Sequence, residues 1–108
     1  DLNFYEVGRS MAGTNETVTT GSPTLTIRGT TSIDSSGGAV TATLPDGEAV
    51  GSIKIIVMTE ATTSSTVSVT NHITSDPEVF TFAQTDDILI LIWAGTQWAT
   101  VFNNGVGT

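Results

Sequence analysis

Apolar side chains alternate with polar, mostly hydroxyl-bearing, side chains in several segments of this chain. The alternation is clearest in residues 24–28 (Thr-Leu-Thr-Ile-Arg) and 66–70 (Thr-Val-Ser-Val-Thr), and residues 78–82 are similar. Successive side chains of a β-strand point to opposite faces of a sheet, so a period of two indicates strands with one buried face. No window carries the apolar stripe of an amphipathic helix. The pattern therefore predicts an all-β protein.

Further strands are expected where apolar runs meet turn residues. A short strand over residues 39–44 ends at Pro45-Asp46-Gly47, where proline fixes φ and glycine accepts a positive φ. Residues 52–59 are mostly apolar, which favours a central strand or one covered on both faces. Residues 87–93 and 97–102 are predicted to form a hairpin.

The remaining segments are expected to be irregular. Residues 29–38 are rich in Ser, Thr, Gly and Asp and are predicted as a loop with Ile33 as its single apolar anchor. The 108 residues suit one domain, with an arm and linker over residues 1–20 and the folded domain over residues 21–108. Seven to nine short strands predict an antiparallel β-sandwich or a jelly-roll-like barrel.

Charge excludes several classes of partner. The chain has 11 acidic and three basic residues, for a net charge of −8. Phosphate recognition needs clustered cations, but Arg9, Arg28 and Lys54 are far apart in sequence, so neither nucleic acid nor an anionic membrane is expected as a partner. No apolar run approaches the roughly 18–20 residues of a membrane span. The absence of Cys excludes disulfides and thiolate chemistry.

The titratable residues do not form a catalytic motif. His72 is the single histidine and precedes a turn, where its ring is expected to cap backbone groups rather than act as a catalytic base. A metal site built from His72, Asp76 and Glu78 is equally disfavoured.

Two sets of acidic residues are candidate calcium ligands, and no Asp-x-Asp-x-Asp-Gly loop accompanies either. They are Asp86 with Asp87, and Asp46 with Glu48 and Glu60. Adjacent acids at a strand entry are more typical of a solvated turn. The sequence therefore predicts a protein that is not an enzyme, with no cofactor and no metal.

Three large side chains have more than one interpretation. Trp93 ends an apolar run and is expected in the core, whereas Trp98 is a candidate for a subunit contact or a glycan-stacking surface. Lys54 lies within an apolar strand. It is expected to snorkel or face an edge, with pairing to a carboxylate, or an isopeptide bond to an Asn, as alternatives.

The N-terminal segment is the candidate binding region. Its apolar residues are either a first strand of the domain's own sheet or an arm that adds to the sheet edge of a neighbour. The residues expected to contact a capsid or a neighbouring subunit are Leu2, Phe4, Tyr5, Val7 and Arg9.

The order of motifs between residues 38 and 101 resembles a module of tailed-bacteriophage virion proteins. The motifs are residues 38–57, which contain Leu-Pro-Asp-Gly before an apolar strand, residues 66–72 (Thr-Val-Ser-Val-Thr-Asn-His), and residues 86–98, which end in Trp-Ala-Gly-Thr-Gln-Trp. Similar motifs occur in capsid decoration (cement) proteins, head fibres and tail-fibre segments. The first forty residues carry no such likeness.

The resemblance implies a non-enzymatic structural protein on the capsid surface of a virion. Such proteins are commonly homotrimers that bind the major capsid protein of the assembled head and stabilise the shell. Phe4 and Tyr5 would then be apolar anchors of the docking arm. The alternative that the resemblance leaves open is a head-fibre or tail-fibre module that binds a receptor or glycan.

Overall fold

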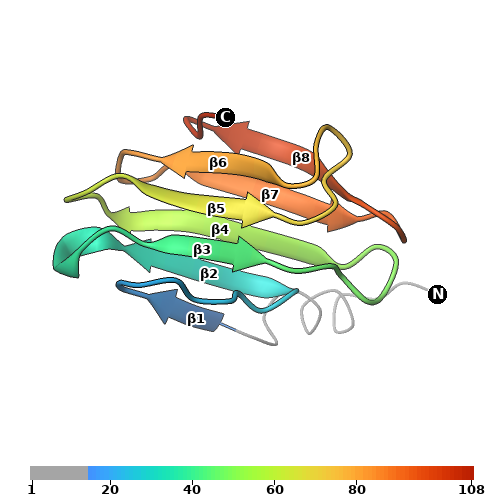
Figure 1. Cartoon of the computed structure of the whole chain (residues 1–108), viewed down its shortest axis with the longest axis horizontal. Helices are drawn as coiled ribbons and strands as arrows, with labels where there is room; N and C mark the ends of the chain where they lie inside the picture. Colours follow the sequence, from blue (N-terminus) through green and yellow to red (C-terminus); the bar gives the residue numbers. More distant parts are fainter. Residues whose placement is uncertain (1–14) are drawn as a thin grey trace.

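The computed structural model describes residues 15–108, which form a two-layered β-sandwich (Figure 1). A single 3₁₀ turn, η1 (Ser35–Gly37), follows the second strand. The strands are β1 (Asn15–Val18), β2 (Gly29–Asp34), β3 (Thr41–Leu44), β4 (Ile53–Glu60), β5 (Ser65–Val69), β6 (Glu78–Phe82), β7 (Ile88–Trp93) and β8 (Trp98–Asn104). The all-β sandwich predicted from the alternation is confirmed.

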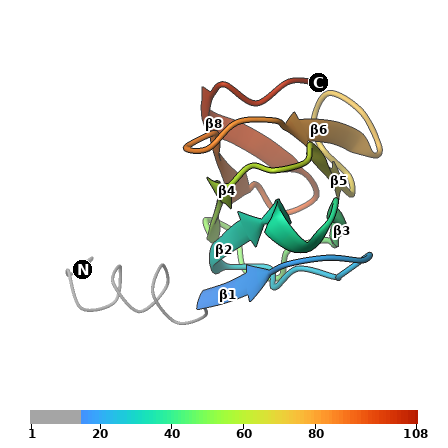
Figure 2. The same cartoon turned by 90° about the vertical axis from the view of Figure 1, so that its left-hand side faces the viewer.

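The strands form a five-stranded sheet of order β1-β2-β4-β7-β8 and a three-stranded sheet of order β3-β5-β6. Figure 2 shows the two sheets edge-on. Three pairings are antiparallel (β4–β7, β5–β6 and β7–β8), but β1–β2, β2–β4 and β3–β5 are parallel. The sheets of the sandwich are therefore mixed, with antiparallel pairing in only part of each. From β2 to β5 successive strands belong to alternate sheets. β4 therefore runs parallel to β2 in the larger sheet, and β5 runs parallel to β3 in the smaller one.

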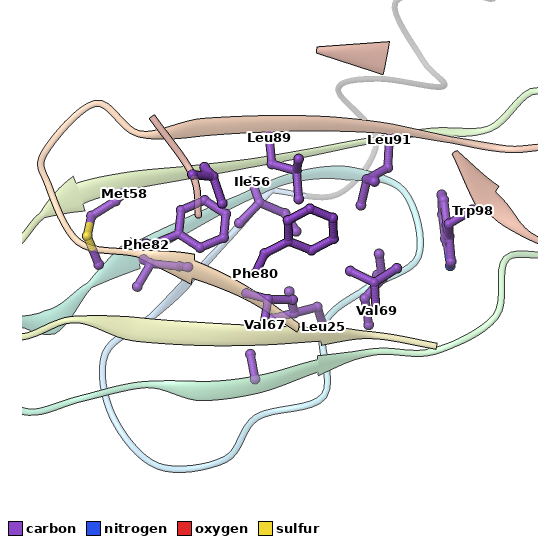
Figure 3. Packing of buried hydrophobic residues seen from close by; sticks show 14 of the residues in the cluster. Leu25, Ile56, Met58, Val67, Val69, Phe80, Phe82, Leu89, Leu91 and Trp98 are labelled. Carbon is purple, nitrogen blue, oxygen red and sulfur yellow. The ribbon is translucent and has the colours of Figure 1, made fainter. Parts of the chain in front are cut away.

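The core lies between the two sheets and is built by the inward-facing rows of both (Figure 3). In β4 and β7 every second side chain is buried, which is the period of two expected for strands that bury one face. Trp93 belongs to this core, as predicted. The other buried apolar residues are Leu25, Ile33, Val40, Ala42, Leu44, Ile56, Met58, Val67, Val69, Phe80, Phe82, Leu89, Leu91, Trp98 and Val106.

The segment expected to be a loop contains a central strand. β2 lies between β1 and β4, and its inward residues Gly29, Thr31 and Ile33 are buried. β2 was predicted as a loop because its residues are mostly Gly, Thr and Ser, which are common in turns. In the structure its buried and partly exposed residues alternate, as in a strand with one buried face. Residues 24–28, by contrast, form no regular strand, and within them only Thr24 makes an isolated bridge, to Thr43.

Both margins of the three-stranded sheet are covered by irregular chain. On the β3 side, Thr41 N–H donates to the Gly21 carbonyl at 2.8 Å and Leu25 N–H donates to the Thr43 carbonyl at 2.8 Å. On the β6 side, Thr81 and Gly107 exchange two backbone hydrogen bonds, at 2.7 and 3.0 Å. These contacts join residues 21–25 and the C-terminal residues to the smaller sheet.

The margin of the five-stranded sheet at β8 is irregular. The register with β7 shifts between Ile90 and Leu91, where Val101 is the extra residue of a bulge. Two residues later the Asn103 side chain donates to the Val106 carbonyl at 3.0 Å and accepts the Val106 N–H at 2.9 Å. The strand is thereby bent and closed by its own side chain.

The other margin of this sheet is β1, which lies inside the range 1–20 expected for arm and linker. β1 pairs with β2 in register from Asn15 to Val18. The ordered sheet therefore includes residues that the sequence reading assigned to the linker.

We predict that Gly47→Ala destabilises the fold, by about 1–3 kcal/mol, because a Cβ at this position would lie 2.5 Å from Cγ of the buried Trp93 ring. Gly37→Ala is the matched control, since its Cβ would meet no atom closer than the Thr19 carbonyl at 3.7 Å. Urea unfolding of both variants measures the difference. Equal stabilities would contradict this account of the turn.

Candidate functional site

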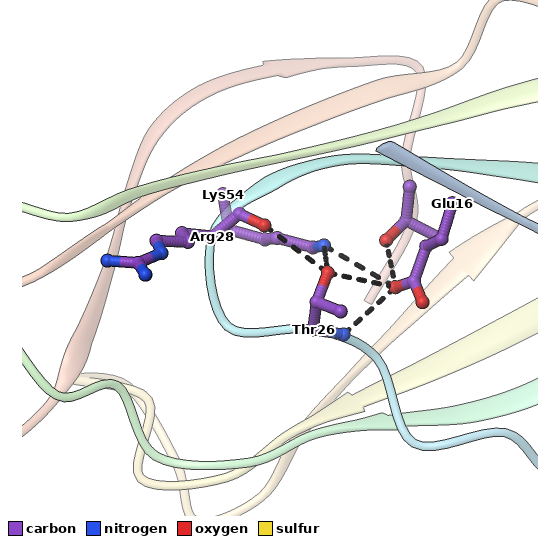
Figure 4. Close-up of polar contacts among 5 residues, drawn as sticks. Glu16, Thr26, Arg28 and Lys54 are labelled. Carbon is purple, nitrogen blue, oxygen red and sulfur yellow. Dashed lines mark hydrogen bonds and ion pairs between the residues drawn. The ribbon is translucent and has the colours of Figure 1, made fainter. Parts of the chain in front are cut away.

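The most unusual side chain in the core is Lys54, which is fully buried on the inner face of β4. Its Nζ donates to Thr26 Oγ1 at 2.9 Å and lies 3.6 Å from Glu16 Oε2 (Figure 4). The residue opposite Lys54 on β2 is Gly29. Because Gly29 has no side chain, the lysine stem can cross β2 to reach β1.

Glu16 is the acceptor at the centre of this cluster. Its Oε2 accepts the Thr31 hydroxyl at 2.6 Å, the Thr26 N–H at 2.9 Å and the Thr26 hydroxyl at 3.2 Å. Burial opposes its ionisation, but these hydrogen bonds and the Lys54 charge outweigh burial and lower the pKa of Glu16. The carboxylate is thus held ionised beside the lysine.

For Lys54, in contrast, the effect of burial on the pKa outweighs the effect of the neighbouring charge. Removal from water lowers the pKa of Lys54 to about 8, against the attraction of Glu16 that favours the charged form. At neutral pH the pair is an ammonium and a carboxylate that join β4 to β1. The expectation of a snorkelling or edge-facing lysine is wrong, because the head group is buried with the stem. Within residues 15–108 the polar contacts of the Lys54 side chain are with Thr26 and Glu16, and no Asn is among them.

We predict that Glu16→Gln destabilises the protein by about 3 kcal/mol, because it leaves the Lys54 ammonium buried without its counter-charge. Lys54→Met combined with Glu16→Gln should recover part of this loss, since no buried charge then remains. Chemical denaturation of the single and double variants gives the coupling energy. Arg28→Met removes an exposed positive charge and is the control. Additive effects at positions 16 and 54 would contradict the pairing.

His72 closes a turn on the inner side of the fold. Its Nδ1 accepts the Thr74 N–H at 3.1 Å, so the ring proton is on Nε2, which lies 2.9 Å from Thr100 Oγ1. The ring also packs edge-on against Phe80, with centroids 5.4 Å apart. The predicted capping of backbone groups is confirmed.

Three of the acidic residues named as candidate ligands hold turns through hydrogen bonds. Asp87 Oδ2 accepts the N–H groups of Ala83 and Gln84, both at 3.0 Å, and Asp76 Oδ1 accepts the Asn71 N–H at 2.8 Å. Asp46 accepts the Asn71 side-chain amide at 2.8 Å. Within residues 15–108 no three His, Asp or Glu side chains are grouped so that they could hold a metal ion.

We predict that stability falls with acidification below about pH 6.5 through His72. Burial lowers the pKa of His72, with Glu78 partly opposing the shift, so the unfolded state binds the proton more readily than the native state. The His72 contribution is therefore constant above the ordinary pKa of 6.5 and is lost as pH falls toward the native pKa. Urea midpoints from pH 5 to pH 8 measure this loss, and His72→Asn should remove it. An identical slope in that variant would contradict the assignment.

Trp98 lies in the core rather than at the surface. It is fully buried, its Nε1 donates to the Pro45 carbonyl at 2.9 Å, and its ring packs edge-on against Trp93 with centroids 5.3 Å apart. The ring therefore offers no free face to a sugar or a neighbouring subunit. The pair fixes the turn after β3 against the β7–β8 hairpin.

β4 is a central strand, as predicted, and within residues 15–108 the outer side of β4, β7 and β8 is apolar and partly exposed. We call it the aliphatic face. Its β4 and β7 residues form three cross-strand pairs, and Ala99 and Phe102 continue it on β8. The paired residues are Ile53 with Ile92, Ile55 with Ile90, and Val57 with Ile88. All six are partly exposed, and Phe102 is 50% exposed.

The outer side of the other sheet is different. It consists of Thr41 and Thr43 on β3, Thr66 and Ser68 on β5, and Val79 and Thr81 on β6. We call it the hydroxyl face. Sheets with one exposed face ordinarily turn polar residues outward, and the hydroxyl face follows this rule. The aliphatic face does not, which could have been recognised from the consecutive apolar residues in both β4 and β7.

The proposed arm residues Leu2, Phe4, Tyr5, Val7 and Arg9 lie outside the described residues. In the part of the chain that is described, no helix is long and apolar enough to cross a membrane. The sequence matches no protein-family model and no curated protein.

Proposed function

We propose that this chain is a virion structural protein that decorates the capsid of a tailed bacteriophage, binding the assembled head and stabilising it. In this proposal it acts as a homotrimer, contacts the major capsid protein and carries out no chemistry. A protein that binds only the assembled shell stabilises that shell by mass action, in proportion to its occupancy.

The observation that most supports a role in assembly is the aliphatic face. Contiguous exposed apolar surface on a small domain is typical of a protein-contact site. The interior, by comparison, is fully committed to the fold: in the described part of the chain every buried side-chain nitrogen and oxygen has a hydrogen-bond partner. Lys54, His72 and Trp98 use their polar groups in hydrogen bonds within the fold. The apolar outer surface has no such internal role and is available to a partner.

The contact with the capsid is assigned to the N-terminal residues. β1 is an edge strand, so Asn15 lies at a margin of the five-stranded sheet. A segment attached there is well placed to pair with or pack against a neighbouring protein. Phe4 and Tyr5 supply large apolar area, and Arg9 supplies a charge for an acidic partner.

We expect the protein to occupy regular positions on purified phage heads and to lose occupancy when residues 1–9 are deleted. The measurement is binding of the purified chain to heads that lack it, followed by cryo-electron microscopy. Leu2→Ser with Phe4→Ser tests the apolar anchors in the full-length chain, and Val50→Ser, at a 75% exposed position, is the control.

The location of binding decides between the proposals. Regular copies on the head support decoration, whereas copies confined to the tail or to fibres support a receptor-binding or glycan-binding module. Unchanged occupancy after the deletion would contradict the role of the arm, and absence from every virion fraction would contradict both functions.

A further inference from the structure

We propose that Asn104 and Gly105, at the end of β8, form a site of spontaneous deamidation whose product releases the C-terminal residues from β6. The reaction uses only the chain itself and water, so it requires no enzyme. The inference is independent of the proposed function, because it concerns the chemistry of one dipeptide and needs no partner protein.

The dipeptide Asn104–Gly105 is the one Asn-Gly step of this sequence. Asparagine is among the thermally labile residues, and its deamidation begins when the backbone nitrogen of the next residue attacks the side-chain amide carbon. Glycine has no Cβ to obstruct that attack, and its backbone reaches conformations that other residues avoid. Both residues are exposed in the structure. The step therefore has the residue types and the access to water that the reaction needs.

The two neighbouring asparagines differ in how their amides are held. Asn103 uses both polar atoms of its side chain, donating to the Val106 carbonyl at 3.0 Å and accepting the Val106 N–H at 2.9 Å. Within residues 15–108 no hydrogen bond engages the Asn104 side chain or the Gly105 N–H. The attacking nitrogen and the attacked amide are thus both available at Asn104, whereas the Asn103 amide is fixed.

The reaction has two steps, and its atoms balance in each. The Gly105 nitrogen loses its proton and bonds to Asn104 Cγ, and the side-chain nitrogen leaves as ammonia, which closes a five-membered imide. Water then opens the imide at one of its two carbonyl carbons. One opening gives aspartate, and the other gives isoaspartate, in which the main chain runs through Cβ and Cγ. No electrons are transferred, and either product carries one new negative charge.

Isoaspartate lengthens the main chain by one atom inside the segment that the Asn103 side chain closes. Val106, at the other end of that segment, is buried, and Gly107 exchanges backbone hydrogen bonds with Thr81 of β6 at 2.7 and 3.0 Å (Figure 1). A longer path between residues 103 and 106 displaces these donors and acceptors, and hydrogen bonds weaken steeply when their geometry is lost. The C-terminal residues are therefore expected to detach from β6.

The new carboxylate also arises close to an existing one. Gly105 packs so closely against Asp87 that a Cβ at position 105 would collide with Asp87 Oδ1. Asp87 is itself held in place, because its Oδ2 accepts the N–H groups of Ala83 and Gln84. Like charges repel at this range, so the added charge and the added backbone atom act in the same direction.

The test is incubation of the folded, full-length protein at mildly alkaline pH and body temperature, followed by peptide mapping with mass spectrometry. Deamidation raises the mass of a peptide by about 1 Da, and chromatography separates its aspartate and isoaspartate forms. Conversion at Asn104 should be at least about 10-fold faster than at Asn103, Asn71 or Asn15, where the next residue has a side chain that obstructs attack.

Hydrogen exchange at the Thr81 and Gly107 amides measures the release, since these two amides join the C-terminal residues to β6. Both should exchange at least about 10-fold faster in the isoaspartate form. Asn104→Gln is the matched control, because its longer side chain would have to close a six-membered ring, so exchange should stay slow after the same incubation. Freshly purified Asn104→Asp has the charge without the extra backbone atom and should lie between the two forms.

Each result supports the proposal or overturns it. Mass gain concentrated at Asn104, with faster exchange at both amides, supports it. An Asn104 that stays intact in the folded protein while the urea-unfolded chain converts overturns it, because the fold then protects the step. Mass gain with unchanged exchange also overturns it, and so does faster exchange in incubated Asn104→Gln, since loosening then has another cause. None of these results bears on head binding, so the proposed function stands or falls separately.

Discussion

The two sheets pack against each other through one row of side chains from each, and this packing decides which side chains face outward. The inner rows of β4 and β7 meet those of β5 and β6, and Trp93 and Trp98 close one end. Because the strand period is two, burying one row presents the other outward. The two outer surfaces therefore follow directly from the core. One is hydroxylated and suited to water, and the other is aliphatic.

The pair formed by Lys54 and Glu16 extends this constraint to the edge of the larger sheet. β1 has only four residues and contributes Val18 to the margin of the core. Its inward carboxylate receives hydrogen bonds from Thr26 and Thr31 as well as the charge of Lys54. Hydrophobic contact alone would hold so short a strand weakly. The polar cluster instead couples β1, the chain after it and β4 into one unit.

Much of the fold could be predicted from local pattern. β6 was expected at residues 78–82, where it lies, and the β7–β8 hairpin was expected within a few residues of its ends. β2 was missed because Gly29 and Thr31 are small or polar although buried, so its central position depends on neighbours far away in sequence. The pairing of Lys54 with Glu16 could not be predicted from local sequence either, because the two residues are 38 positions apart. The parallel pairings arise from how the chain changes sheets, which no short segment encodes.

The bulge at Val101 and the closure of Asn103 onto Val106 have a consequence for crowded conditions. An open, straight strand edge can recruit further strands without limit and so initiate fibrils. Here β8 is bent and its end is occupied, β1 is short, and irregular chain covers both margins of the smaller sheet. Molecules held at high local density therefore meet no long, straight strand edge on which a further strand could add, which suppresses strand-by-strand growth.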